Sequence, residues 1–259
     1  MAKKPLALYW SSSKPNFGDA LSPLICEAVS SRKIRYAKTP DCDLISIGSL
    51  MQRVKEGFFK KQIHVWGTGF IEEKSPYKSK HIYHAIRGQL SNQTISNHQI
   101  TTLGDPGLLA DLLLKPNQHK TKKYKIGFIE HYKDKNNPLI SQLVDKYANT
   151  TRIDIYLPPL IFLARLAECD VIFSSAMHGL IAADSLGIPN SRIVLSDQLR
   201  GGDFKFQDYY SAFNIASRTT TLDIDTIQTS SESIANNYSR PYIDEIKKKL
   251  YAAFPQELD

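Results

Sequence analysis

The sequence has few cysteines and no long apolar run. Its three cysteines, Cys26, Cys42 and Cys169, lie at unrelated spacings in apolar surroundings. They fit neither a disulfide framework nor a zinc site, so we expect buried free thiols in a reducing compartment. No stretch approaches the ~18 consecutive apolar residues of a membrane span. The apolar run near the start is too short for the core of a signal peptide, and a cytoplasmic protein is expected.

Several motifs that hold metals or nucleotides are also missing. The sequence has no HExxH motif, no closely spaced carboxylates of the kind that hold magnesium, and no Walker loop. Gly67-Thr-Gly69 is too short for the dinucleotide fingerprint and lacks its third glycine. We therefore expect no metal and no NAD dependence.

Positive charge is in excess, with a formal net charge of +7. The lysine clusters, such as Lys120–Lys125 and Lys247–Lys249, are dispersed and lack regular aromatic neighbours. This pattern disfavours nucleic acid as a partner. An anionic membrane surface or a phosphorylated substrate suits it better.

Short apolar runs that end at Gly, Ser or a charged residue alternate with helical patterns along the whole chain. The predicted strands are Leu6–Trp10, Asp43–Ile47, Ile63–Trp66, His81–Ile86, Ile100–Leu103, Tyr124–Glu130, Ile153–Tyr156, Asp170–Ser174 and Ser191–Leu195. This alternation predicts an α/β protein with parallel sheets that are covered on both faces.

The length of 259 residues suits two α/β domains. The most polar run in the middle of the chain is Lys115–Lys123, which contains Pro116 and is predicted to be the interdomain linker. The predicted domains are residues 1–119 and 120–259.

A histidine follows the buried strand predicted at Asp170–Ser174. His178-Gly179 opens a helical stretch that Gly187 and Pro189 close. Ligands of open α/β sheets bind where a strand passes into a helix N-terminus, because free N–H groups point into that crevice. His178 is therefore either a ligand-binding residue or a helix cap.

Seven blocks of the sequence, in this order, resemble the polysaccharide pyruvyltransferase family. They are Asn16–Pro23, Trp66–Phe70, Ile86–Gly88, Leu103–Pro106, Ile126–Tyr132, Ser174–Leu180 and Lys205–Tyr210. The blocks cover most of residues 5–213, and together they are far more specific than any one of them.

The resemblance implies a glycosyltransferase-B-like arrangement of two Rossmann-like domains with the active site in the interdomain cleft. The first domain would lie on the acceptor side and the second on the donor side, with C-terminal helices that pack back on the first. The implied enzyme transfers a pyruvyl group from phosphoenolpyruvate, a co-substrate rather than a cofactor, to a pair of sugar hydroxyls and forms a ketal. The acceptor would be a polysaccharide or its precursor, including a lipid-linked one at the inner face of the cell membrane.

This chemistry needs proton transfers and anion anchors. His178 is the first choice for donor binding or general acid. His131, at the end of a predicted strand, is the second choice, for acceptor contact or for acid–base work. Asp19 either caps the predicted helix Ala20–Ser30 or acts as a carboxylate toward sugar hydroxyls.

Anion binding is expected from residues beside predicted strand ends and in one glycine-containing loop. Arg87 follows a strand and is the leading anion anchor, with a surface salt bridge as the alternative. Ser175 and Gly179 belong to the block around His178. Arg200 and Lys205 flank Gly201-Gly202, in a loop that would close on an anion.

One position departs from the family pattern, which has an arginine where this chain has Ala176. Such an arginine would pair with donor phosphate or carboxylate. Two other functions therefore stay open: a nucleotide-sugar-dependent glycosyltransferase of the same architecture, and a non-catalytic or partner-dependent relative.

Overall fold

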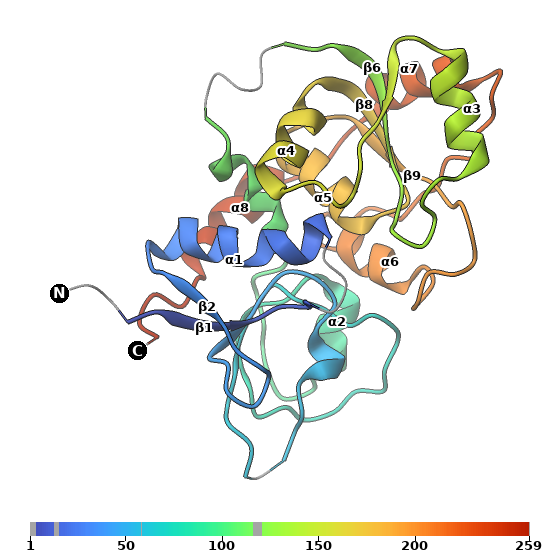
Figure 1. Cartoon of the computed structure of the whole chain (residues 1–259). Helices are drawn as coiled ribbons and strands as arrows, with labels where there is room; N and C mark the ends of the chain where they lie inside the picture. Colours follow the sequence, from blue (N-terminus) through green and yellow to red (C-terminus); the bar gives the residue numbers. More distant parts are fainter. Residues whose placement is uncertain (1–3, 13–15, 58, 116–120, 259) are drawn as a thin grey trace. The chain divides into compact units, whose positions relative to one another are not determined.

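The computed structural model describes residues 4–12, 16–57, 59–115 and 121–258. It is an α/β protein with two parallel sheets, of five and four strands, and this confirms the predicted fold class (Figure 1). The chain forms two compact units. Unit 1 contains Met1–Leu109, Arg200–Ser217 and Pro241–Asp259, and unit 2 contains Ala110–Leu199 and Arg218–Arg240.

Unit 1 has a sheet in the order β2-β1-β3-β4-β5, with every neighbouring pair parallel. Its strands are β1 (Leu6–Tyr9), β2 (Ile34–Tyr36), β3 (Leu44–Ile45), β4 (His64–Trp66) and β5 (Ile82–Ala85). Its helices are α1 (Phe17–Ser30), the 3₁₀ turn η1 (Met51–Arg53), α2 (Gln89–Thr94), α6 (Phe204–Ser211) and α8 (Ile243–Ala252). The 3₁₀ segment η2 (Pro106–Leu113) runs on into unit 2.

Apolar side chains cover both faces of the unit 1 sheet. All four residues of β1 are buried, as expected for a central parallel strand. Ile45 and Val65 belong to a core cluster on one face together with Phe70. Trp66 donates its indole N–H to the carbonyl of Leu250 in α8 at 2.9 Å, so the end of the chain packs within the same unit.

Unit 2 has a sheet in the order β7-β6-β8-β9, again parallel throughout. Its strands are β6 (Tyr124–Ile129), β7 (Thr150–Arg152), β8 (Cys169–Ser174) and β9 (Asn190–Arg192). Its helices are α3 (Pro138–Lys146), α4 (Pro159–Ala167), α5 (Met177–Ser185) and α7 (Ile227–Asn237).

Helices cover both faces of this second sheet. Phe128 and Phe173 pack in a core cluster with Ile140 of α3 and Ile227 of α7. On the other face, α5 approaches so closely that a Cβ at Gly179 would lie 2.5 Å from Ser174 Oγ. Gly179 therefore allows the helix that follows β8 to lie directly on the sheet.

Two strand predictions were wrong, and one strand was missed. β2 was not predicted, because Ile34-Arg35-Tyr36 is a largely exposed edge strand without an apolar run. The strand predicted at Ile153–Tyr156 is replaced by β7, since the β-branched Thr150 and Thr151 pair with β6 instead. Ile100–Leu103 contributes only a single bridge between Ile86 and Leu103, because the backbone turns at Gly104, whose φ is 135°.

The predicted linker Lys115–Lys123 and the boundary between residues 119 and 120 include residues 116–120, which lie outside the described residues. That boundary stays a prediction.

The three cysteines are free and buried, as the sequence predicted. Burial raises the pKa of the Cys26, Cys42 and Cys169 thiols to about 12, so none is a thiolate at neutral pH. Within the described ranges, no helix combines the length and the apolar character needed to cross a membrane.

Candidate active site

Both sheets have a point where the strand order reverses. In unit 1 the chain leaves β1 for β2 on one side and returns to β3 on the other, and in unit 2 it leaves β6 for β7 and returns to β8. The loops at such a point diverge and leave a crevice beyond the carboxyl ends of the two central strands, where doubly wound proteins bind ligands. The candidate site residues after β1, β6 and β8 lie beside these two reversals.

In unit 2 the loops after β6 and β8 are joined by a hydrogen bond. The backbone N–H of His131, after β6, donates to Ser175 Oγ, after β8, at 2.8 Å. The N–H of Ser175 donates to the carbonyl of Ile129 at 3.0 Å and extends the ladder between the strands by one step. Two predicted site residues, His131 and Ser175, thus meet at the reversal of the second sheet.

A buried carboxylate organises this position. Asp134 Oδ2 accepts a hydrogen bond from Ser175 Oγ at 2.8 Å, and its Oδ1 accepts from Ser196 Oγ at 2.5 Å. The N–H of Asp134 donates to the carbonyl of His131 at 2.7 Å. We name Asp134, Ser175, Ser196 and the backbone of His131 the Asp134 cluster. Because the Ser175 hydroxyl donates to Asp134 and accepts from His131, its orientation is fixed.

The ring of His131 is half-buried and packs against Tyr132, with centroids 4.2 Å apart. Its Nδ1 lies 3.3 Å from the N–H of Lys133 and accepts from it. With Nδ1 as the acceptor, Nε2 is the nitrogen that carries the proton of the neutral ring. His131 is therefore held as a donor through Nε2.

His178 is the second residue of α5, in the first turn of the helix that follows β8. The N-cap is Ala176, whose carbonyl accepts from the N–H groups of Gly179 and Leu180 at 3.1 and 3.4 Å. The His178 ring is half-buried and its Nε2 atom is buried. It lies at the positive end of the helix dipole, which favours an anion beside it.

In unit 1, Asp19 lies after β1, in the first turn of α1. The prediction that Asp19 caps this helix was wrong, because Asn16 is the N-cap and the helix begins at Phe17. Asn16 Oδ1 accepts from the N–H of Asp19 at 3.1 Å, and Asn16 Nδ2 donates to Asp19 Oδ2 at 2.6 Å. These two reciprocal hydrogen bonds between the N-cap and the third helical residue resemble those of a capping box.

Asp19 is also electrostatically unusual. Desolvation by burial raises its pKa from 3.8 to about 6, although the hydrogen bond from Asn16 and the charge of Arg53 act in the opposite direction. A carboxyl with such a pKa exchanges protons near neutral pH, which suits acid–base work.

Arg87, after β5, is fully buried within unit 1. Its Nε donates to Asp208 Oδ2 at 2.9 Å and its Nη1 to Ser49 Oγ at 2.6 Å, while Nη2 donates to the carbonyl of Phe70. Asp208 also accepts from the N–H and hydroxyl of Ser91, at 2.7 and 2.6 Å. The alternative of a surface salt bridge is wrong, since the pair is buried. The anion-anchor role stays a prediction, and it requires an anion to replace Ser49 at Nη1.

Arg200 and Lys205 lie in different surroundings. Arg200 is exposed and its Nη2 is 3.4 Å from Glu72 Oε1, a solvated contact that leaves the guanidinium accessible. Lys205, in α6, is 9% exposed and its ammonium lies 5.2 Å from the centre of the Phe206 ring.

The sequence patterns gave no role to Asp134, Ser196 or Asp208. Asp134 stands in the polar run Lys133-Asp-Lys-Asn-Asn137, which reads as solvated loop, and Ser196 lies outside every matched block. Asp208 lies inside the block Lys205–Tyr210, so the resemblance of that block to the family could have indicated this residue. Within the described parts of the chain, no group of three or more His, Cys, Asp or Glu side chains is placed to hold a metal ion.

Two doubly wound parallel sheets with polar side chains at their reversals define an α/β protein of the Rossmann-like class. Residues 5–193 match the family model "Polysaccharide pyruvyl transferase", and the chain belongs to this family.

Two relatives extend the comparison over most of the chain. Uncharacterized protein L143 of Acanthamoeba polyphaga mimivirus is 28% identical over 224 residues, which cover 82% of this chain and 76% of the relative. Succinoglycan biosynthesis protein ExoV of Rhizobium meliloti is 24% identical over 227 residues, which cover 84% of this chain and 68% of the relative.

Proposed function

We propose that the protein transfers a pyruvyl group from phosphoenolpyruvate to a pair of hydroxyls on a saccharide and forms a pyruvate ketal. Membership of the polysaccharide pyruvyl transferase family supports this reaction class, and the name of the ExoV relative supports a polysaccharide or its precursor as acceptor. The observation that carries the proposal is the hydrogen bond between His131 and Ser175 at the sheet reversal, beside the helix whose first turn contains His178.

The reaction balances without a redox cofactor. One sugar hydroxyl attacks C2 of phosphoenolpyruvate while C3 gains a proton and becomes a methyl group. The C2–O bond to phosphate then breaks, and the second hydroxyl attacks C2 to close the ketal. Of the two protons that the hydroxyls lose, one is balanced by the new C–H bond and one leaves with inorganic phosphate.

The proton transfers and the stabilisation of the leaving phosphate are assigned to His178, His131 and Asp19. His178 lies at a helix N-terminus, where the donor's anionic groups are stabilised, and acts as general acid toward C3. His131 is held with Nε2 as its proton-bearing nitrogen and donates a hydrogen bond to the leaving phosphate, which itself keeps the second proton. Asp19, whose pKa is about 6, is the base toward acceptor hydroxyls.

Anion binding in unit 2 is assigned to Ser175 and to the backbone around Gly179, and it requires the Ser175 hydroxyl to donate to the anion in place of Asp134. Asp134 is a positioning residue here, because it accepts the Ser175 proton and fixes the direction of that hydroxyl. In unit 1, Arg87, Arg200 and Lys205 remain proposed anion ligands. Of these, Arg200 needs the least rearrangement because it is the most exposed.

The experiment that tests this function is phosphate release from phosphoenolpyruvate, measured with and without saccharide acceptors. We expect release that depends on the acceptor, and a fall of about 10²–10⁴-fold for His178→Ala because a general acid is lost. His98→Ala is the matched control, since His98 is half-buried in unit 1 and contacts the carbonyl of Ser79. Near-normal activity of folded His178→Ala would refute the assignment.

The same assay separates the alternatives. Selective turnover of UDP-sugars in place of phosphoenolpyruvate would identify a glycosyltransferase instead. Ala176→Arg tests the non-catalytic alternative: transfer seen only in that variant would mean that the natural chain is not a competent pyruvyltransferase. Our account expects transfer by the natural chain.

A further inference from the structure

An exposed turn of unit 1 lies between η1 and β4. The N–H of Lys60 donates to the carbonyl of Gly57 at 3.1 Å and closes the turn. The ammonium of Lys80 donates to the carbonyls of both Gly57 and Lys60, so a side chain from just before β5 braces both ends of it. We call the segment formed by Gly57, Phe59 and Lys60 the Phe59 turn.

The Phe59 turn exposes a large apolar side chain. Phe59 is 95% exposed, whereas the next most exposed large apolar side chain in the described residues, Tyr242, is 67% exposed. Exposure of a phenylalanine ring to water is unfavourable. Binding that moves the Phe59 ring into an apolar environment would therefore be favourable.

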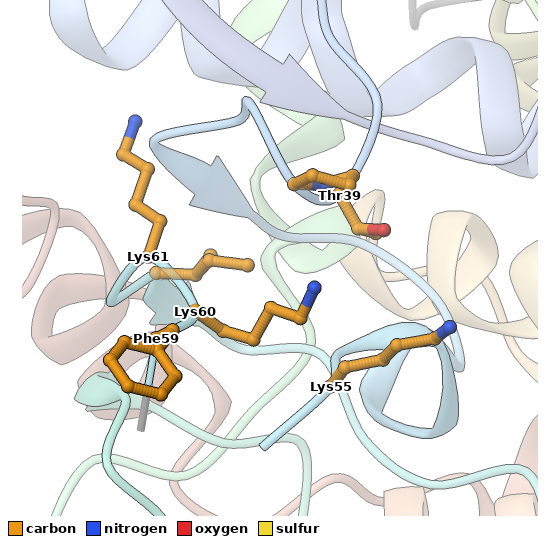
Figure 2. Close-up of a pocket in the computed structure, with 7 residues that line it drawn as sticks. Thr39, Lys55, Phe59, Lys60 and Lys61 are labelled. Atoms are coloured by element: carbon orange, nitrogen blue, oxygen red, sulfur yellow. The ribbon is translucent and has the colours of Figure 1, made fainter. Parts of the chain in front are cut away.

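Lysines surround this side chain. A pocket of about 330 Å³ beside the turn is lined by Thr39, Pro40, Lys55, Phe59, Lys60, Lys61 and Ile63, so three of its lining residues are cationic. Figure 2 shows that the side chains of Lys55 and Lys60 extend in the same direction, to the right of the view, while that of Lys61 extends upward, away from them. The pocket thus combines an exposed aromatic ring with two lysine side chains that extend in the same direction.

The acidic groups nearby are already engaged. Lys61 pairs with Asp43 at 2.5 Å. Glu56 accepts from the hydroxyl of Ser79 at 2.7 Å and from the N–H of Lys80 at 3.2 Å. No ion pair involves Lys55 or Lys60 within the described part of the chain. Their charge is therefore available to an external anion.

We propose that the Phe59 turn and the lysines beside it dock this protein on an anionic membrane surface. The Phe59 ring enters the interfacial layer, and the ammonium groups of Lys55 and Lys60 bind the phosphate of an anionic lipid headgroup. Aromatic rings and lysines favour this layer, where the ring is partly desolvated and the ammonium groups reach the phosphates. The net charge of +7 attracts the whole chain to the same surface. This inference does not rest on pyruvyl transfer, because docking is measured without turnover.

The test is flotation of the full chain with vesicles. Vesicles of two parts phosphatidylcholine to one part phosphatidylglycerol should bind the chain, and vesicles of phosphatidylcholine alone should bind it far less. Lys55→Gln with Lys60→Gln should weaken binding roughly 25-fold, at about fivefold for each lysine. Phe59→Ser should weaken it about fivefold or more, because the apolar contribution is lost.

Matched controls keep the test specific. Lys33→Gln with Lys248→Gln removes the same charge from exposed sites elsewhere in unit 1, and Leu160→Ser removes an exposed apolar side chain in unit 2. Both controls should change binding much less than the corresponding changes at the Phe59 turn. Equal losses would show general attraction of a cationic protein and would overturn the proposed surface.

A fluorescent variant tests entry of the ring directly. The chain has two tryptophans, and Phe59→Trp adds one at the turn. We expect the extra emission to shift to shorter wavelength on anionic vesicles and to be quenched by brominated lipid. Absence of both effects while the chain is bound would overturn the insertion of Phe59. So would binding of soluble glycerol phosphate at Lys55 and Lys60 with no vesicle binding, since the pocket would then serve a free anion.

Discussion

Asp134 lies in the loop after β6, and its carboxylate connects that loop to the loops after β8 and β9. Asp134 is buried and accepts hydrogen bonds from the hydroxyl groups of Ser175 and Ser196. Ser175 in turn accepts a hydrogen bond from the backbone N–H of His131. A single carboxylate therefore sets the geometry of the loops after three strands. The substitution Asp134→Asn keeps the size of the side chain and removes its charge. If Asp134 positions Ser175, this variant should still fold but should bind the donor more weakly.

Asp19 gives a prediction at the same scale, on the free energy of unfolding. Burial raises its pKa in the folded state to about 6, above the ordinary value of 3.8 for an aspartic acid side chain. The folded state therefore keeps a proton that the unfolded chain has lost between these pH values, and stability falls as pH rises through them. Above about pH 6 the ionised Asp19 lowers the free energy of unfolding. Replacing Asp19 with a neutral side chain should restore that free energy.

We therefore expect Asp19→Asn to be more stable than the natural chain by about 1–3 kcal/mol at pH 7 and equal to it below about pH 4. Urea unfolding at both pH values measures this. The difference between the two proteins is the quantity to compare, because burial also raises the pKa of Asp105 to about 6 in both. The transfer activity of Asp19→Asn should fall. An Asp19→Asn variant that is more stable and fully active would contradict the role of Asp19 as a base.

Among the elements of unit 1, the segment between β5 and α2 is joined to α6 by a buried ion pair. Arg87 and Asp208 are both fully buried and lie 2.9 Å apart. A Cβ at Gly88 would lie 1.7 Å from the carbonyl oxygen of Asp208, so the backbones themselves are in close approach. The pair therefore has a structural role in the unit 1 fold, whatever anion Arg87 binds.

Removing one partner of this pair tests that role. Asp208→Ala leaves the Arg87 charge buried without its partner and should cost about 3–5 kcal/mol in the free energy of unfolding. The matched control is Asp225→Ala, because Asp225 pairs with Lys146 at 2.7 Å on the exposed surface. That control should cost less than about 1 kcal/mol. Similar losses in the two variants would contradict the burial of the pair.

At the scale of the whole molecule, the sequence predicted the parts of the fold that local pattern determines. Strands such as β6 and β8 are dense in apolar residues and end sharply at polar ones, so their positions and the α/β class were found. β7 was misplaced because Thr150-Thr151-Arg152 is polar, whereas the apolar residues that follow it lie outside the strand. Pairing with β6, and not local composition, selects that segment.

The candidate site was predicted only in part for the same reason. His131 and Ser175 lie at strand ends that the pattern shows, but their mutual hydrogen bond joins residues 44 positions apart. Asp134 gains its role from Ser175 and Ser196, which lie 41 and 62 positions away. No spacing rule connects such residues, so their grouping follows from the strand order.

The most direct test of the central claim is the fate of the enolpyruvyl carbons. Phosphoenolpyruvate labelled in those carbons is incubated in D₂O with the chain and with saccharide acceptors, including lipid-linked precursors, and the saccharide is analysed by mass spectrometry and NMR. The account predicts a labelled pyruvate ketal whose methyl group carries one solvent deuterium, formed together with inorganic phosphate. Labelled carbon that never enters the saccharide, while a UDP-sugar is turned over by the same chain, would contradict it.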